Sequence, residues 1–482
     1  MCADLKIRCY RFALALYWLW AQVLCCFRTL FGKVSARPKV MIIPCEPWSI
    51  VGSRGDEAMI VAIIQHFRQE HPEGEVVIIS GTPDFERTTD GQRLRQMSPT
   101  GTGASPLPVT PNAERRTSNS ELGDLCETVS TGTGTPSSPV GSGDALVPDA
   151  GQRLGSSVRF LHAWRGRIPI RAIFRALCSE APTEFYVLGA DCMDGHYSVW
   201  TSLILLASAD LGHRLGIPTH LTGFSFNEHP ESTLLPYYRL VSSSFVFNVR
   251  DAVSLARFVE QTGRRARLVA DVAFNLVPEH AALCDAHFEW ARAQKARGRS
   301  VIGFNLHILL VPEGQPFETF ARRVADQLSK VLENRSDLAL LFIPHDYRGG
   351  GDVACLQPVY QPLSERFPDR VRLVEEVLSA AQLKGLCVAL DGLFTSRMHL
   401  GIAALGMGVP VMGFVYQGKF AGLWRHFELP QTYCLCPGAI GTDEMSIRLC
   451  EFLSNLSDLR AQVACRYSSV KALAELNFEA LS

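Results

Sequence analysis

Short runs of apolar, β-branched residues alternate with helical segments twice along this chain, and no other pattern in the sequence limits its fold as strongly. The first block has expected strands at 40–43, 75–80, 185–189, 220–226, 245–249 and 267–272, with helices at 56–68, 168–178, 199–215, 234–242 and 252–261. The second block has expected strands at 301–306, 338–344, 371–374, 387–391 and 409–415, with helices at 317–333, 379–386 and 397–406. Such alternation predicts parallel sheets that helices cover on both faces. We therefore expect an α/β protein of two tandem Rossmann-like domains, with a ligand site in the cleft between them.

Changes in composition suggest where the chain divides. We expect an N-terminal apolar segment at 1–37, Rossmann-like domains at 38–276 and 299–435, a linker with a helix at 277–298, and C-terminal helices at 436–482. Between Phe85 and Phe160 there is no Phe, Tyr, Trp or Ile, and Ser, Thr, Gly and Pro dominate. Such a segment buries too little apolar surface to offset its ordering entropy. Residues 88–157 are therefore expected to be a disordered insertion in the first domain.

Residues 12–27, FALALYWLWAQVLCCF, are apolar apart from Gln22. As a helix they would span about 24 Å, which is short of the roughly 30 Å hydrocarbon core of a bilayer. Three interpretations remain open: a marginal single-pass anchor, a helix in the membrane interface with Trp18 and Trp20 as anchors, or a helix packed on the protein itself. We expect a membrane-associated or single-pass protein, otherwise a cytoplasmic one, and the side of the membrane is not set.

Charge and cysteine content exclude some classes of function. The 47 Lys and Arg residues nearly cancel the 48 Asp and Glu residues, and a net charge of −1 argues against a globally basic nucleic-acid binder. The 15 cysteines are dispersed and form no CxxC pair, so reduced and mostly buried thiols are expected. No metal site is predicted, because no third ligand stands at a metal-site spacing from His345-Asp346.

Residues that carry charge or protons follow several expected strands. Ser396, Arg397 and His399 lie at the start of a helix, where unpaired N–H groups and the helix dipole favour an anion. A cation there opposes the dipole, so either an anion joins it or a local acid such as Asp391 pairs with Arg397. Arg250 follows another strand at the expected cleft.

Three further parts of the chain hold candidates. Asp56 and Glu57 open the first helix after a glycine-containing loop, and capping alone would also favour acids there. The loop matches neither GxGxxG nor a P-loop. Asp271 ends the last strand of the first block, and Lys419 stands in an otherwise apolar loop.

In this order, these residues resemble the polysaccharide pyruvyl transferase family over roughly residues 39–430, apart from the insertion. The matching parts are Gly55-Asp56-Glu57-Ala58, Val249-Arg250-Asp251 with Ser254, Asp271-Val272-Ala273-Phe274, His345-Asp346, Ser396-Arg397-Met398-His399, Gly408-Val409-Pro410-Val411 and Tyr416-x-x-Lys419. Two parts depart from the family pattern: Ser53-Arg54 stand where Asn is usual, and Ala190-Asp191-Cys192 stand where a Gly-Gly pair is common.

The resemblance implies a GT-B-like fold and transfer of pyruvate from phosphoenolpyruvate (PEP) onto two hydroxyls of a sugar in a polysaccharide or glycan. Whether that acceptor is lipid-linked or a finished glycan is left open. PEP would be a co-substrate, with no cofactor. Arg250 and Arg397 would bind its anionic groups, with Lys419 as a weaker anion contact. His399 would transfer a proton or bind phosphate, and Asp56 or Glu57 would orient or deprotonate the acceptor.

This hypothesis requires the guanidinium groups of residues 250 and 397 to lie close together and not to be buried against the protein's own acids. The alternatives are a nucleotide-sugar glycosyltransferase with the same two-domain architecture and a catalytically silent saccharide-binding member.

Overall fold

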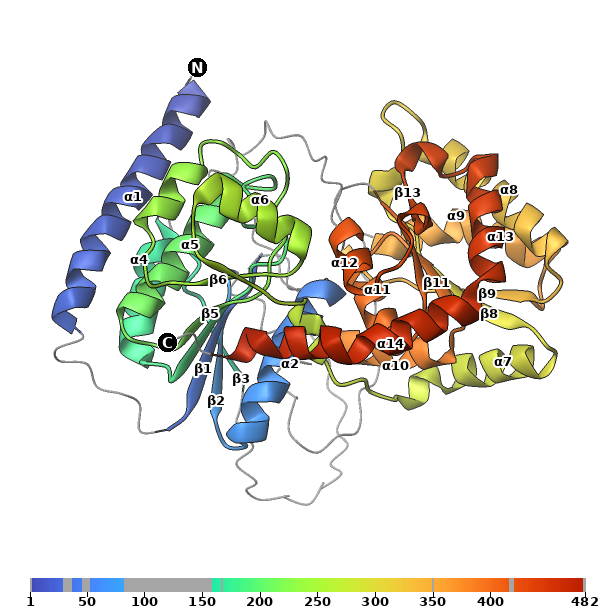
Figure 1. Cartoon of the computed structure of the whole chain (residues 1–482), viewed down its shortest axis with the longest axis horizontal. Helices are drawn as coiled ribbons and strands as arrows, with labels where there is room; N and C mark the ends of the chain where they lie inside the picture. The colour runs from blue at the N-terminus through green and yellow to red at the C-terminus, as the bar shows by residue number, and fades with distance from the viewer. Residues whose placement is uncertain are drawn as a thin grey trace, which may run out of the picture.

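The computed structural model describes residues 2–28, 37–45, 53–81, 158–165, 168–348, 351–415 and 420–479. These residues form two α/β domains that lie beside each other (Figure 1). The expected insertion at 88–157 lies outside the described ranges.

The first domain is built on a parallel five-stranded sheet in the order β3-β2-β1-β4-β5. Its strands are β1 (Lys39–Ile43), β2 (Glu75–Ile79), β3 (Val158–Leu161), β4 (Glu184–Val187) and β5 (Thr219–Leu221). A parallel pair, β6 (Phe247–Val249) and β7 (Ala266–Leu268), extends this order through bridges from Phe224 to Ala190 and to Val249. The helices are α2 (Arg54–Glu70), α4 (Pro169–Glu180), α5 (Val199–Arg214) and α6 (Ala252–Thr262), with 3-10 turns η2 (Leu235–Leu240) and η3 (Val272–Asn275).

The second domain repeats this topology in a six-stranded parallel sheet, β10-β9-β8-β11-β12-β13. Its strands are β8 (Ser300–Phe304), β9 (Leu338–Phe342), β10 (Val371–Leu373), β11 (Gly392–Thr395), β12 (Val411–Phe414) and β13 (Cys434–Leu435). Its helices are α7 (Asp285–Ala296), α8 (Phe317–Asn334), α9 (Gly351–Arg366), α10 (Ala380–Leu386), α11 (Met398–Leu405), α12 (Phe420–His426), α13 (Asp443–Ser454) and α14 (Leu456–Glu475). Each domain therefore has the order 3-2-1-4-5-6 of a doubly wound fold, and the predicted fold class is confirmed.

One predicted strand is wrong. Residues 387–391 were expected to be extended, but Cys387–Ala389 form a 3-10 turn and the strand begins at Gly392. The reason is local: a capping box at Ser379 starts α10, and the 3-10 turn continues directly from the end of that helix. The predicted helix at 234–242 is likewise a 3-10 turn, η2.

The N-terminal segment forms α1 (Cys2–Arg28), which lies on the outer side of α4 and α5 (Figure 1). Trp18, expected as one of two interface anchors, is instead fully buried, and its Nε1 donates to Oδ2 of Asp210 at 2.8 Å. The third interpretation, packing on the protein, therefore describes this face of the helix. The single-pass expectation finds no match: within the described part of the chain, no helix is both long and apolar enough to cross a membrane.

The two domains meet beside η3. Nζ of Lys384, in α10, donates to the carbonyl oxygens of Phe274 at 3.0 Å and Leu276 at 2.7 Å. Burial lowers the pKa of Lys384 to about 7, which favours the neutral amine, whose two N–H donors match these two carbonyls. After α14 the chain returns to the first domain, where the side chain of Asn477 accepts from the Gly223 N–H at 2.7 Å and donates to Ala270 O at 2.8 Å.

Candidate active site

In each sheet, the first and fourth strands along the chain lie side by side, β1 beside β4 and β8 beside β11. The strand order changes direction at this point, and the loops that follow these two strands leave room for a ligand at their carboxyl ends. In the first domain these ends lead into the start of α2 after β1, and into residues 188–194 after β4. In the second domain they lead to Asn305 after β8 and to Arg397 after β11. Side chains from both domains therefore gather at the boundary between them.

The start of α2 packs against the second domain. Arg54 is only 1% exposed, its Nε donates to Leu378 O at 2.6 Å, and its guanidinium lies 4.8 Å from the centre of the Tyr347 ring. Its NH1 pairs with Oε2 of Glu57 at 2.7 Å. Sequence reasoning treated Arg54 only as a departure from the family pattern, yet its side chain bonds α2 to the opposite domain.

Asp56 and Glu57 are both buried and both contact groups of their own domain. The thiol of Cys45 donates to Oδ1 of Asp56 at 2.8 Å. The pKa of Cys45 is well above its usual range because of a hydrogen bond with Cys192, burial and the Asp56 charge. Glu57 is held by Arg54 as described, so the acceptor-orienting roles of the two acids stay predictions.

Arg250 is enclosed by acids. Its guanidinium pairs with Asp191 and, at 3.0 Å, with Asp271, and its Nε donates to the Ser225 hydroxyl at 2.7 Å. Burial alone would lower the pKa of Arg250, but Asp191 and Asp271 outweigh it and raise the pKa.

Arg397 is likewise paired, through NH2 and Nε with Asp352 at 2.5 and 3.0 Å and through NH1 with Asp346 at 3.2 Å. Asp391, the partner considered from the sequence, binds Lys295 instead, at 3.0 Å. The expectation that these two guanidinium groups would be unpaired and form a cationic pocket is therefore wrong, because the buried Arg250 and the half-buried Arg397 are each paired with carboxylates of their own domain.

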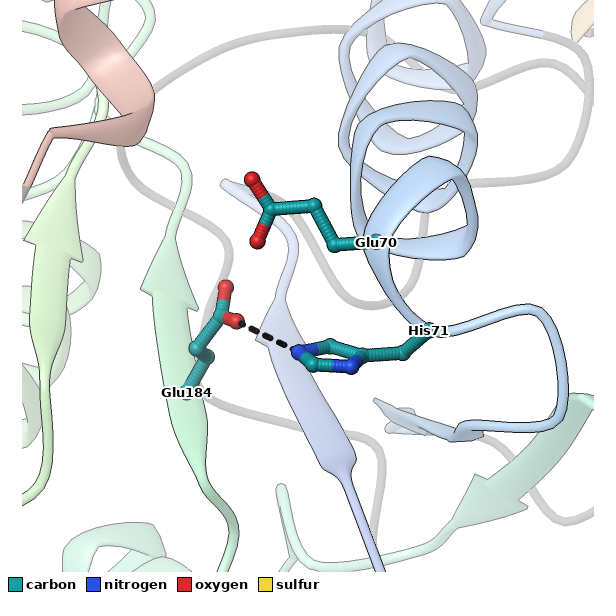
Figure 2. Close-up of side chains that lie close together, drawn as sticks. All are labelled: Glu70, His71 and Glu184. Carbon is teal, nitrogen blue, oxygen red and sulfur yellow. Dashed lines mark ion pairs between the residues drawn. The ribbon is translucent and has the colours of Figure 1, made fainter.

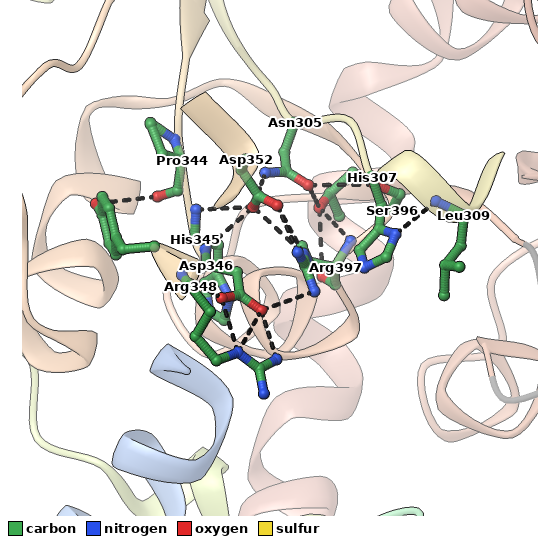
Figure 3. A network of polar contacts seen from close by, with 12 residues as sticks. Asn305, His307, Leu309, Pro344, His345, Asp346, Arg348, Asp352, Ser396 and Arg397 are labelled. Carbon is green, nitrogen blue, oxygen red and sulfur yellow. Dashed lines mark hydrogen bonds and ion pairs between the residues drawn. The ribbon is translucent and has the colours of Figure 1, made fainter. Parts of the chain in front are cut away.

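Asp352 organises the carboxyl ends of the second sheet (Figure 3). Its carboxylate accepts from the backbone N–H groups of His345 at 2.9 Å and Asp346 at 3.1 Å, and from the side-chain amide of Asn305 at 2.8 Å. Ser396 donates to Oδ1 of that Asn305 at 3.3 Å and is 1% exposed. Ser396 and His345 thus belong to a buried network that sets the shape of the site.

The charges in this network balance. Burial, reinforced by the positive charge of Arg397, lowers the pKa of His307 to about 3 and that of His345 well below its usual range, so both imidazoles are neutral. Burial raises the pKa of Asp346, but its bonds to Arg348 and the charge of Arg397 bring it to about 2. Arg348, which sequence reasoning missed, binds this carboxylate through Nε at 3.0 Å and NH2 at 2.6 Å, and its side chain is 39% exposed.

His399 lies where the domains touch. Its Nε2 has no hydrogen-bond partner among the described residues, and the nearest acid is Oδ2 of Asp271, 3.7 Å away. On its other side stands Gly55, where a Cβ would come within 2.5 Å of Nδ1 of the ring. A cavity of only about 10 Å³ lies close by, lined by Arg250, Asp271 and Met398 among others. Lys419 lies outside the described residues.

One group among the described residues brings together three side chains that could each offer a ligand atom to a metal ion (Figure 2). Glu70, His71 and Glu184 place one ligand atom each within 4.8 Å of one another. Glu184 is the first residue of β4, so the group lies at the opposite end of the sheet from the carboxyl ends. Glu184 also accepts from the Tyr186 hydroxyl at 3.0 Å, and we assign no metal there.

Comparison with known proteins agrees with this architecture. A family model described as polysaccharide pyruvyl transferase matches residues 54–418. No curated protein matches the chain. Among solved structures, a UDP-glucosyltransferase from Polygonum tinctorium capable of glucosylating indoxyl has a TM-score of 0.50 at 12% identity, covering 92% of this chain and 99% of its own. A UDP-GlcNAc 2-epimerase from Neisseria meningitidis has a TM-score of 0.48 at 10% identity, covering 91% and 99%. At these identities the likeness concerns the fold alone, and the first of these structures supports a GT-B-like arrangement.

Proposed function

Because the chain belongs to the polysaccharide pyruvyl transferase family, and is therefore a transferase, we propose that it moves the pyruvyl group of phosphoenolpyruvate onto two hydroxyls of a sugar. The products are a pyruvate ketal and inorganic phosphate. The matched range, 54–418, contains every candidate residue except Lys419.

The proposed reaction has two steps. A proton adds to the methylene carbon of PEP while a sugar hydroxyl bonds to C2 through an oxocarbenium-like state, and that hydroxyl loses its proton. A second hydroxyl then bonds to C2, phosphate leaves with the C2–O bond electrons, and the second hydroxyl proton is released. Such a sequence needs one group that donates a proton to carbon and one that removes protons from the acceptor.

The position of His399 carries the proposal. A proton donor needs a nitrogen that the protein itself does not occupy, and Nε2 of His399 is buried but makes no hydrogen bond among the described residues. Oδ2 of Asp271 faces this nitrogen at 3.7 Å. Because Gly55 and Asp271 come from one domain and His399 from the other, both domains form the surroundings of the donor.

The paired arginines limit how PEP can bind. Arg348 and Arg397 share the carboxylate of Asp346, which is the arrangement that two guanidinium groups adopt around one anionic group. We propose that the phosphate or carboxylate of PEP takes the place of Asp346 between them. Arg250, held between two acids, is assigned instead to positioning Asp271.

The test is PEP-dependent phosphate release by the full chain with a panel of pyruvylatable sugars, followed by mass analysis for the ketal. His399→Gln should lower turnover by about 10²–10⁴-fold with unchanged thermal unfolding. A matched control is His280→Gln, because His280 also stands beside an acid, Asp285 at 3.1 Å, but is exposed; it should retain full activity.

Two results would contradict the proposal. Binding of a UDP-sugar without binding of PEP in calorimetry would favour a glycosyltransferase. Tight glycan binding without turnover for any sugar would favour a catalytically silent saccharide-binding member. The pairing of Arg250 and Arg397 with the protein's own acids would then explain the lack of turnover.

A further inference from the structure

One face of α1 is locked to the first domain. Leu14, Trp18, Ala21 and Cys25 are buried on it. The amide of Gln22 donates to Asp210 Oδ2 at 2.8 Å and to Leu240 O at 2.9 Å, beside the Trp18 bond to the same carboxylate. These bonds fix the rotation of the helix about its axis.

The opposite face of α1 is apolar and exposed. Its members, which we call the α1 ridge, have exposed fractions of 65, 50, 43, 53 and 57%, and they are Phe12, Leu16, Leu19, Trp20 and Val23. At about 100° per residue, they fall within an arc of roughly 100°, directly opposite the buried residues. A contiguous exposed apolar surface of this kind marks an interaction site.

Basic side chains border the ridge. Arg171 and Arg175 are exposed one turn apart on α4, which packs against α1. Both arginines lie close enough to Tyr17 of α1 for their positive charges to act on its hydroxyl. Burial raises the pKa of Tyr17, and these two charges oppose that rise. The arginines therefore stand beside the Tyr17 side of the helix. Residues 1–39 contain Lys6, Arg8, Arg11, Arg28, Lys33, Arg37 and Lys39 but a single acid, Asp4.

We propose that the α1 ridge docks on the surface of an anionic bilayer, with α1 parallel to the membrane plane. The ridge is about 16 Å long, and its apolar residues would enter the headgroup boundary with Trp20 at the depth that Trp prefers. The arginines would meet anionic headgroups. Because α1 lies on the side of the first domain away from the second (Figure 1), docking leaves the site between the domains uncovered.

The charges favour lipid over a second copy of this chain. A symmetric dimer through the ridge would bring Arg171 and Arg175 of each copy toward those of the other, and like charges at an interface oppose association. An anionic lipid surface meets the same groups with the opposite sign. The inference goes beyond the proposed transfer reaction and does not depend on it.

Vesicle flotation of the full chain tests the proposal, with phosphatidylcholine vesicles that either contain phosphatidylglycerol or lack it. Wild type should float with the anionic vesicles. The double variant L16Q/W20Q should reduce binding by about tenfold or more, and R171E/R175E should reduce binding to anionic vesicles most. The matched control is V388Q/I447Q, which changes two apolar residues, each 57% exposed, on the second domain; it should bind as wild type does.

Circular dichroism and thermal unfolding check that each variant folds. Because all the changed side chains are exposed, we expect no loss of structure. Equal binding by wild type and L16Q/W20Q overturns the proposal, as does the absence of binding to anionic vesicles. A wild-type dimer that L16Q/W20Q converts to a monomer, without vesicle binding, also overturns it and assigns the ridge to a second copy.

Discussion

Nε2 of His399 lies 3.7 Å from Oδ2 of Asp271, and the two residues come from different domains. The same Asp271 carboxylate oxygen pairs with Arg250 at 3.0 Å. The first domain therefore supplies the carboxylate of this pair, and the second domain supplies the imidazole ring that faces it.

Replacing Asp271 with Asn should lower turnover. The amide keeps the shape and the cap to the Ala273 N–H, but it removes the carboxylate that pairs with the buried Arg250 at 3.0 Å and faces the His399 ring at 3.7 Å. Both kcat and the free energy of unfolding should therefore fall, as measured by steady-state kinetics and denaturation. Full activity of the variant would show that Asp271 does not act on His399.

Gly55→Ala should disturb the same ring from its other side. The added methyl would come within 2.5 Å of Nδ1 of His399, so the ring or the start of α2 must shift, which costs about 1–3 kcal/mol of stability. Turnover should fall with it. Gly401→Ala is the control, since its Cβ would meet its nearest neighbours at an ordinary 3.6 Å. Equal turnover by the two variants would contradict the close packing.

Asp352→Ala should destabilise the second domain by about 3–5 kcal/mol, because the fully buried carboxylate is the closest partner of the half-buried Arg397 and accepts three further N–H groups. Equilibrium denaturation measures this loss. Asp369→Ala, at an exposed position, should change stability by less than about 0.5 kcal/mol. A similarly small effect at Asp352 would mean that the network of Figure 3 is not a major source of stability.

The lowered pKa of Lys384 predicts that the free energy of unfolding rises with pH. Its pKa is about 7 in the folded chain and ordinarily 10.5, so between these values the unfolded chain binds a proton that the folded chain does not. Stability is therefore lowest below pH 7 and increases as pH approaches 10.5, by about 1.4 kcal/mol for each unit of lowered pKa. Lys384→Met should remove this contribution from the pH dependence of urea unfolding. An identical pH dependence in both proteins would contradict the assignment.

Much of the fold could be predicted because its signals are local. The run at 75–80 and the helix at 252–261 match β2 and α6 to within one residue. Helix α9 was missed because Pro358 and Pro362 lie inside it, and prolines ordinarily argue against a helix. Strand β3 was missed because it follows directly after the low-complexity segment.

Several members of the candidate site were predicted from the sequence, but most of their pairings were not. His399, Arg250 and Arg397 were found because they follow strands, and strand ends converge in a doubly wound sheet. Two of their acid partners were not, because Asp352 is 45 residues from Arg397 and Asp191 is 59 residues from Arg250. No local spacing encodes such contacts. The glycine run before Asp352 was the available signal, since such a run in a sequence favours a break between regular elements.

The chain crosses between the domains beside η3 and again through α14, and the two crossings touch, with Nζ of Lys471 bonded to Asn275 at 2.5 Å. Any hinge motion must bend both crossings at this one place. The distance between Asp271 and His399 therefore reports how far one domain has rotated against the other. A pair of spectroscopic labels, one on each domain near these residues, would record substrate-driven movement without any assay of product.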